Sequence, residues 1–167
     1  MKAAKYLEIQ GRFAMQRGHL INPTIAFETW GTLNARADNA VLIFTGLSPS
    51  AHAASSPIDP SAGWWEDMIG HGKPLDTNCY FIICINSLGS CFGSTGPASD
   101  NPETQEPYRL DFPVLTVEDI ATSAYHVLDH LGIDQLHTVV GASMGGMTAL
   151  AFALGQPARC KRLVSIS

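Results

Sequence analysis

Three runs rich in apolar residues constrain the fold of this chain more than any other feature. They are AVLIFT at residues 40–45, YFIICI at 80–85 and LHTVV at 136–140, and each is followed directly by Gly or Asn. Strands that read this way are usually buried on both faces, as in a parallel sheet that helices cover. Two further β-rich runs lie at 24–29 and 162–166. The sequence therefore predicts a mostly parallel sheet.

Helical patterns separate the later runs. Residues 117–131 repeat apolar side chains at helical spacing, with Thr116 placed as the N-cap and Gly132 just past the end. A second pattern covers about residues 144–154 and stops before Gly155. Strands that alternate with helices are typical of right-handed crossover units, so the predicted fold class is α/β. A length of 167 residues suits one domain.

Composition narrows the partners and the location. The net charge is −5 and no basic stretch is present, which argues against nucleic acid. The longest apolar run is far shorter than the ~18 residues of a membrane span. Four cysteines without C-x-x-C spacing, and a start without an apolar signal segment, predict a cytoplasmic protein with reduced thiols. His126 and His130 lie four apart on a predicted helix but lack a third ligand, so no metal site is expected.

The segment GASMGG at residues 141–146 carries the sharpest chemical signal. It directly follows the predicted strand 136–140 and opens the predicted helix. This is the context of a nucleophile elbow, a strained turn that lifts the hydroxyl of Ser143 above the sheet. Gly141 and Gly145, two residues before and two after the serine, must be small to avoid collision in such a turn. The pattern therefore predicts Ser143 as a catalytic nucleophile.

A nucleophile of this kind needs two N–H donors for the oxyanion that develops during the reaction. The N-terminus of the helix that follows Ser143 offers the N–H of Met144. The second donor should come from the loop after residues 40–45. Gly46 allows a close backbone approach there, so the N–H of Leu47 is the predicted donor and that of Ser48 the alternative.

Two long irregular stretches follow predicted strands. Residues 46–63 come after the run at 40–45, and residues 86–113 come after the run at 80–85. Loops of this length in a compact domain are usually functional or disordered. Both leave the carboxyl ends of strands, where open α/β sheets bind ligands. We expect the binding site at this edge.

Several longer segments resemble one enzyme family. They are WGTLN at 30–34, TGLSPSAHAA at 45–54, GWWEDMIG at 63–70, NSLGSCFGSTGPAS at 86–99, PYRLDFP at 107–113 and GASMGGMTAL at 141–150. Together they are similar to the homoserine and serine O-acyltransferases of the α/β-hydrolase fold, from about residue 7 onward. The segments TGLSPSAHAA and NSLGSC are most like the serine O-succinyltransferase branch.

The resemblance implies a fold and an architecture. We expect residues 1–167 to be the N-terminal part of a single α/β-hydrolase domain. Its mostly parallel sheet is expected to be truncated after about the sixth strand, with the cap and the C-terminal strands absent.

The resemblance also implies a reaction. Ser143 would attack the thioester of acetyl-CoA or succinyl-CoA, and the hydroxyl of L-serine or L-homoserine would then take the acyl group from the enzyme, in cysteine or methionine biosynthesis. Acyl-CoA would be a co-substrate, with no cofactor bound permanently. The partners would be small molecules, with a homodimer for the full-length enzyme. The family's substrate-specificity loop would correspond to Ala51, His52, Ala53 and Ala54.

The catalytic triad is incomplete in this sequence. In this fold the acidic residue and the histidine follow the serine along the chain, yet residues 144–167 contain no Asp, Glu or His. His137 precedes Ser143 by six residues, on the predicted strand that leads into the elbow, about 20 Å away. His52 lies in the loop of the predicted oxyanion donor, but nothing in the sequence indicates what would orient it. We therefore expect this chain to be a fragment of a longer enzyme.

Two other functions remain open on the sequence. A carboxylesterase-type hydrolase of the same fold would share the elbow and lack the GSTGP segment at residues 93–97. A non-catalytic, truncated paralogue would bind acyl-CoA without turnover.

Overall fold

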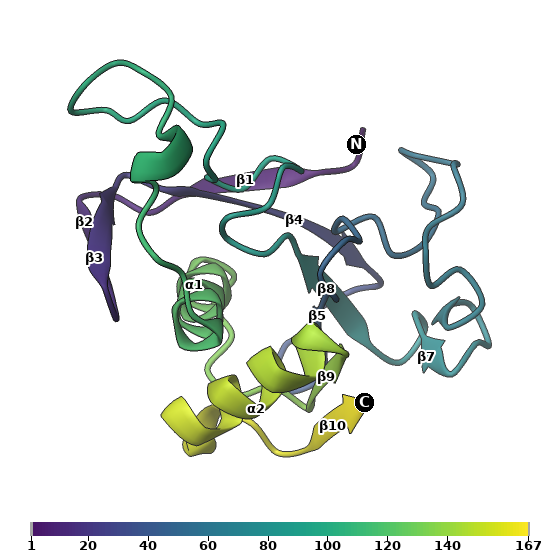
Figure 1. Ribbon diagram of the computed structural model, residues 1–167. Coiled ribbons are helices and arrows are strands. Elements are labelled where there is room, and N and C mark those ends of the chain that lie inside the picture. Colours follow the sequence, from purple (N-terminus) through teal and green to yellow (C-terminus); the bar gives the residue numbers. More distant parts are fainter. Residues whose placement is uncertain (1, 167) are drawn as a thin grey trace.

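A computed structural model describes residues 2–166, and a six-stranded sheet forms its centre (Figure 1). The strand order is β1-β4-β8-β5-β9-β10. Strands β8, β5, β9 and β10 run parallel, whereas β4 is antiparallel to both β1 and β8. The predicted α/β class with a mostly parallel sheet is confirmed. The strands are β1 (Lys5–Glu8), β4 (Thr24–Trp30), β5 (Ala40–Phe44), β8 (Phe81–Ile85), β9 (Thr138–Ala142) and β10 (Leu163–Ile166).

The smaller elements escaped the sequence analysis. Two ribbons pair β2 (Arg12–Met15) with β3 (Gly18–Ile21) and β6 (Ile69–Gly70) with β7 (Leu75–Asp76). Each of these strands has two to four residues, as does β1, and alternation over so few positions carries little signal. Two 3₁₀ turns are η1 (Arg109–Asp111) and η2 (Pro157–Arg159).

The helices α1 (Val117–His130) and α2 (Met144–Gly155) match the two predicted ones. Thr116 caps α1 as expected: its side chain accepts the N–H of Asp119, whose carboxylate accepts the N–H of Thr116 in return. Asp119 also accepts the N–H of Gln16 at 2.8 Å, which ties the start of α1 to the turn between β2 and β3. Neither helix is long and apolar enough to cross a membrane, and residues 2–166 hold no other α-helix.

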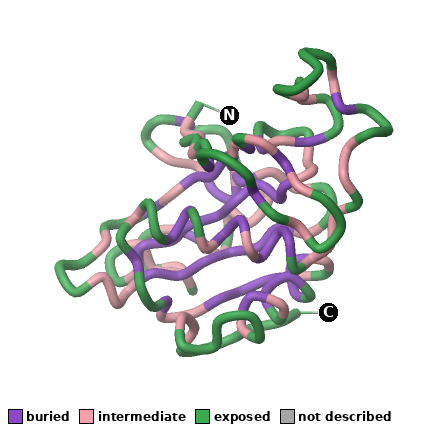
Figure 2. Tube along the Cα trace, turned by 90° about the vertical axis from the view of Figure 1, so that its left-hand side faces the viewer, coloured by how far each residue is buried: buried purple, intermediate pink, exposed green. Residues whose placement is uncertain are grey.

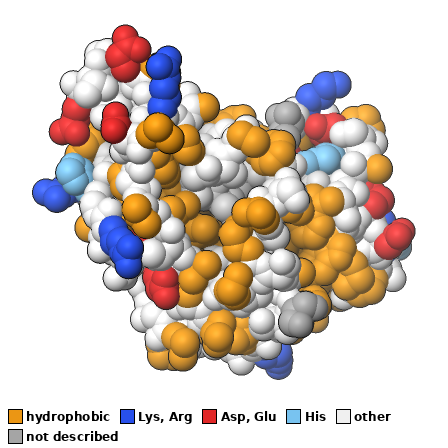
Figure 3. Space-filling view, in the orientation of Figure 1, with side chains coloured by type: hydrophobic (Ala, Val, Ile, Leu, Met, Phe, Trp, Pro, Cys, Tyr) orange, Lys and Arg blue, Asp and Glu red, His pale blue; other side chains and the backbone are white. Residues whose placement is uncertain are grey.

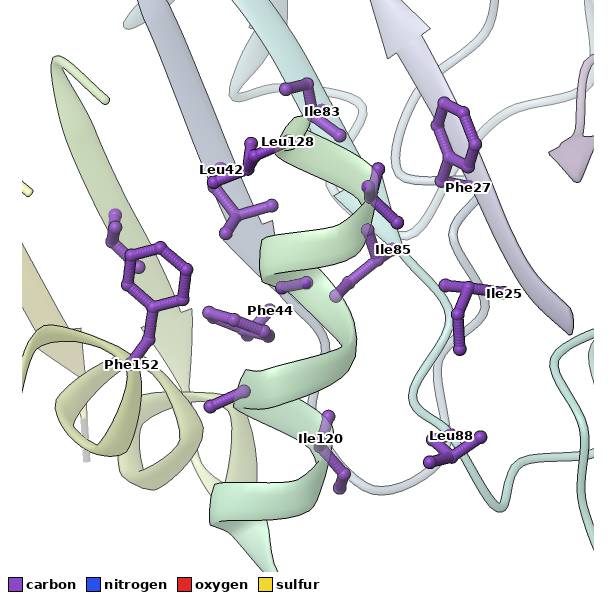
Figure 4. Packing of buried hydrophobic residues seen from close by; sticks show 14 of the residues in the cluster. Ile25, Phe27, Leu42, Phe44, Ile83, Ile85, Leu88, Ile120, Leu128 and Phe152 are labelled. Carbon is purple, nitrogen blue, oxygen red and sulfur yellow. The ribbon is translucent and has the colours of Figure 1, made fainter. Parts of the chain in front are cut away.

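The sheet separates two apolar layers. On one face α1 and α2 pack against alternate residues of the central strands, as Figure 4 shows for Ile120, Leu128 and Phe152 around Leu42 and Phe44. The opposite face is covered by the segment between β5 and β8 instead of a helix. All residues of β5 and β8 are buried, as the uninterrupted apolar runs predict. Buried residues form the centre of the molecule in Figure 2.

Strand β9 lies two residues further along the chain than predicted. The run at 136–140 is the apolar part, but the ladder continues because Gly141 pairs with Phe44 of β5 and Ala142 pairs with Ile166 of β10. The strand therefore ends directly before Ser143. Within residues 2–166, β10 pairs only with β9, and its residues are exposed. Hydrophobic side chains gather beside this end of the chain in Figure 3.

Candidate active site

Ser143 occupies a strained turn between β9 and α2. Its backbone has φ 56° and ψ −125°, a region that side chains with a Cβ rarely adopt. The N–H of Ser143 donates to the carbonyl of Ile166 at 2.9 Å, which fixes the turn to β10. Its side chain is exposed and its hydroxyl has no hydrogen-bond partner within residues 2–166. The geometry is that of a nucleophile elbow; the nucleophilic role of Ser143 stays a prediction.

The glycines around Ser143 have no room for a side chain. A Cβ on Gly141 would collide with the carbonyl of Gly145, and a Cβ on Gly145 would collide with the carbonyls of Phe44 and Thr45. These neighbours are backbone atoms of α2 and of the end of β5, which cannot turn away as a side chain can. The spacing of small residues predicted from the sequence is therefore required by contact between the turn, α2 and β5.

Two backbone N–H groups flank the elbow. That of Met144 lies in the first turn of α2, where N–H groups have no partner inside the helix. That of Leu47 donates to no acceptor within residues 2–166. The loop of Leu47 lies beside the elbow, since a Cβ on Gly46 would stand 3.9 Å from the Cβ of Ser143. Both groups suit oxyanion donors, a role that stays a prediction.

Two cavities open at this edge of the sheet. Leu47 and Met144 both line a cavity of about 140 Å³. A larger one of about 490 Å³ is lined by Leu47 and Ser48 on one side and by residues 89–92, with Pro97 and Ala98, on the other. The two long loops thus meet beside the elbow, at the carboxyl ends of β5 and β8. This is where parallel sheets bind ligands.

His52 is oriented by a residue that the sequence analysis missed. Its Nδ1 lies 3.0 Å from Oε2 of Glu28, which is buried in β4, and its Nε2 donates to the carbonyl of Ser61 at 2.9 Å. The expectation that nothing orients His52 is therefore wrong. The sequence offered one signal for this pair. Glu28 is the only charged residue in the β-rich run TIAFET, and a buried charge needs a partner.

The surroundings of His52 favour its charged form. Burial works against the imidazolium, but the hydrogen bonds to Glu28 and Ser61 and the charges of Glu28 and Asp59 outweigh it, so the pKa of His52 is raised above 6.5. Oε1 of Glu28 is also buried and accepts no hydrogen bond within residues 2–166. The pair anchors the loop after β5 to β4.

This pair should make stability depend on pH. A raised pKa means that the folded state binds more protons than the unfolded state. The stability that His52 contributes is therefore complete below about pH 6.5 and is lost as the pH rises through the folded pKa. Between these limits we expect the free energy of unfolding to fall with pH by at most about 1.4 kcal/mol per pH unit.

Urea denaturation across this range measures the slope. It should flatten in Glu28→Gln and persist in Glu103→Gln, which removes an exposed carboxylate. Equal slopes in the wild type and Glu28→Gln would contradict the assignment.

The three alanines of the predicted substrate-specificity loop are buried. Ala51, Ala53 and Ala54 are 0%, 0% and 1% exposed, and they pack in the apolar layer that also contains Trp30 and Ile43. Their methyl groups hold the loop against the sheet and do not line an open surface. Any influence of these residues on substrate choice would act through the shape of the loop.

No histidine forms a hydrogen bond with the elbow serine in the described part of the chain. His137 contacts Thr138 and Arg162, and His126 packs edge-on against Phe13. Residues 2–166 also contain no cluster of three His, Cys, Asp or Glu side chains that could hold a metal ion.

Comparisons with known proteins agree with this geometry. The model of the α/β-hydrolase fold family matches residues 39–167. The serine O-succinyltransferase of Litchfieldella anticariensis is 61% identical over 99% of this chain and 45% of its own length. The crystal structure of homoserine O-acetyltransferase from Bacillus anthracis superposes with a TM-score of 0.87 at 36% identity, over 98% of this chain and 46% of that one.

The crystal structure of esterase E22 is as similar, with a TM-score of 0.87 at 36% identity over 95% of this chain and 45% of that one. The chain thus spans less than half the length of each of these three proteins. Fold, elbow and sequence lead to one conclusion: the chain belongs to the α/β-hydrolase fold family, with a sequence similar to serine and homoserine O-acyltransferases.

Proposed function

We propose that this chain carries the nucleophile and the oxyanion donors of a CoA-dependent O-acyltransferase. Ser143 takes an acetyl or succinyl group from the CoA thioester, and the hydroxyl of L-serine or L-homoserine then receives it, as a step toward cysteine or methionine. Support comes from the exposed Ser143 in its strained turn, beside a cavity that Leu47 and Met144 line. The names of the two transferase relatives support the substrate class.

The described residues supply the nucleophile and the oxyanion donors of this reaction. No general base among them is hydrogen-bonded to Ser143. Ser143 attacks the thioester carbon and its proton must pass to a general base. The N–H groups of Leu47 and Met144 stabilise the charge on the thioester oxygen, and CoA leaves as its thiol. In the second half-reaction the acceptor hydroxyl attacks the acyl-enzyme and loses its proton to the same base. The ester bond to Ser143 then breaks, and the base returns a proton to the Ser143 oxygen.

The four donor and acceptor combinations test this function. The intact protein is incubated with acetyl-CoA or succinyl-CoA and with L-serine or L-homoserine, and O-acyl amino acid and free CoA are quantified by mass spectrometry. We expect one combination to give O-acyl product in step with CoA release. CoA thioesters that stay intact in all four mixtures would refute the proposal.

A carboxylesterase is the second candidate, because esterase E22 shares the fold of this half as closely as the acetyltransferase does. An esterase would pass the acyl group to water. Hydrolysis of small acetyl esters that outpaces transfer to both amino acids would favour this function.

A further inference from the structure

One side chain joins the two loops that line the larger cavity. Asn86 is the first residue after β8 and is 0% exposed. Its Oδ1 accepts the N–H of Ala51 at 2.6 Å, and its Nδ2 donates to the carbonyl of Phe92. Ala51 belongs to the loop after β5 and Phe92 to the loop after β8. The amide therefore bridges both loops.

The bridged loops carry the walls of the candidate site. Leu47 precedes Ala51 by four residues, and Leu47 and Phe92 line the same cavity of about 490 Å³. Any change in how Ala51 and Phe92 are held would alter the width of this cavity. Because Leu47 lies in the same loop as Ala51, we expect its N–H to shift relative to Ser143 as well.

Asn86 is itself fixed to the sheet. Its N–H donates to the carbonyl of Ala26 in β4 at 2.8 Å, and its carbonyl accepts the hydroxyl of Ser94 at 2.8 Å. The Ser94 hydroxyl oxygen in turn accepts the N–H of Ala26 at 3.0 Å. The amide thus projects from a backbone that is hydrogen-bonded to β4, and both loops are tied to it.

The partners of the side chain require an amide. Ala51 presents a donor and Phe92 an acceptor, so the bridging group must accept on one side and donate on the other. A carboxylate only accepts, and an aliphatic side chain does neither. We propose that Asn86 is a positioning residue for acyl transfer, which holds the loops of Leu47 and Phe92 at the separation that the oxyanion site needs. This rests on the proposed function of Ser143.

Asn86→Asp tests the proposal because the pH decides whether its side chain can donate a hydrogen bond to the carbonyl of Phe92. Burial raises the pKa of the introduced carboxyl, so lowering the pH from about 8 to about 5.5 shifts it from the carboxylate, which cannot donate to the carbonyl of Phe92, toward the acid, which can. The wild type is measured at the same two pH values, so that titration of other groups, such as the pair of Glu28 and His52, affects both proteins alike. Relative to it, we expect kcat/KM of Asn86→Asp for the acyl donor to be at least about tenfold lower at the higher pH. At the lower pH it should recover to within about threefold.

Asn86→Ala should stay impaired at both pH values. Asn22→Asp should be unaffected, because Asn22 is exposed and its side chain uses only Oδ1, which accepts the N–H of Gly11. Hydrogen exchange supplies a readout without catalysis. At the higher pH, residues 45–55 and 86–96 should both exchange about tenfold faster in Asn86→Asp, while α1 keeps its protection.

If the wild type transfers no acyl group, the proposed function fails and the exchange data still decide whether Asn86 joins the loops. Four results for Asn86→Asp would overturn the positioning role. Two concern exchange: an unchanged exchange rate in either loop, or faster exchange in both loops with undiminished kcat/KM. The other two are an equal loss of activity at both pH values and a failure of the variant to fold at either pH.

Discussion

Ser143→Ala is expected to reduce acyl transfer by the intact protein by about 10⁴- to 10⁶-fold, because no other hydroxyl can form the acyl-enzyme at this turn. The wild type is incubated with the acyl donor and quenched rapidly in acid. The peptide that contains Ser143 should then be heavier by the mass of one acyl group. The variant should gain none. Peptide mass spectrometry and steady-state kinetics measure both effects.

Thr104→Ala is the matched control for loss of a hydroxyl, since Thr104 is exposed in the loop after β8 and lines neither cavity of the site. It should keep the activity and the acylation of the wild type. An acyl group on another residue, or full activity in Ser143→Ala, would mean that Ser143 is not the nucleophile.

Gly145→Ala is expected to lower the free energy of unfolding by about 3 kcal/mol or more. The new methyl group would collide with the carbonyls of Phe44 and Thr45, at the contact of α2 with the end of β5. Relief would require α2 to move away from the sheet, and Phe152 and Ala149 would lose part of their packing. Urea denaturation followed by circular dichroism measures the change.

Gly46→Ala separates a clash from the general effect of adding a methyl group. Its Cβ would have ordinary contacts of 3.7–3.9 Å, with the carbonyl of Ala142, Pro49 and the Cβ of Ser143. We expect stability within about 0.5 kcal/mol of the wild type, or slightly above it. If both variants were equally stable, close packing of α2 on β5 would not be the reason for a glycine at 145.

Local patterns predicted the elements that are long and strongly patterned. The uninterrupted apolar runs became β5 and β8 because both faces of these strands are covered. The apolar side chains at helical spacing and the capping residues of α1 are set by residues that are neighbours in the sequence. The predicted bounds of α1 therefore agree with the observed ones to within a residue. The short strands β1, β2, β3, β6 and β7 depend on pairing with a partner, which periodicity over two to four residues cannot reveal.

The sequence by itself determined the class of the fold and the position of the candidate nucleophile, because a strand, a small-residue turn and a helix follow one another directly around Ser143. Tertiary structure alone decided which residues support that site. Glu28 reaches His52 across 24 positions, and Asn86 reaches Ala51 across 35. Such contacts arise because strand order places β4, β8 and β5 side by side. No local pattern encodes that neighbourhood, so the partners of buried polar groups emerge only when the sheet is assembled.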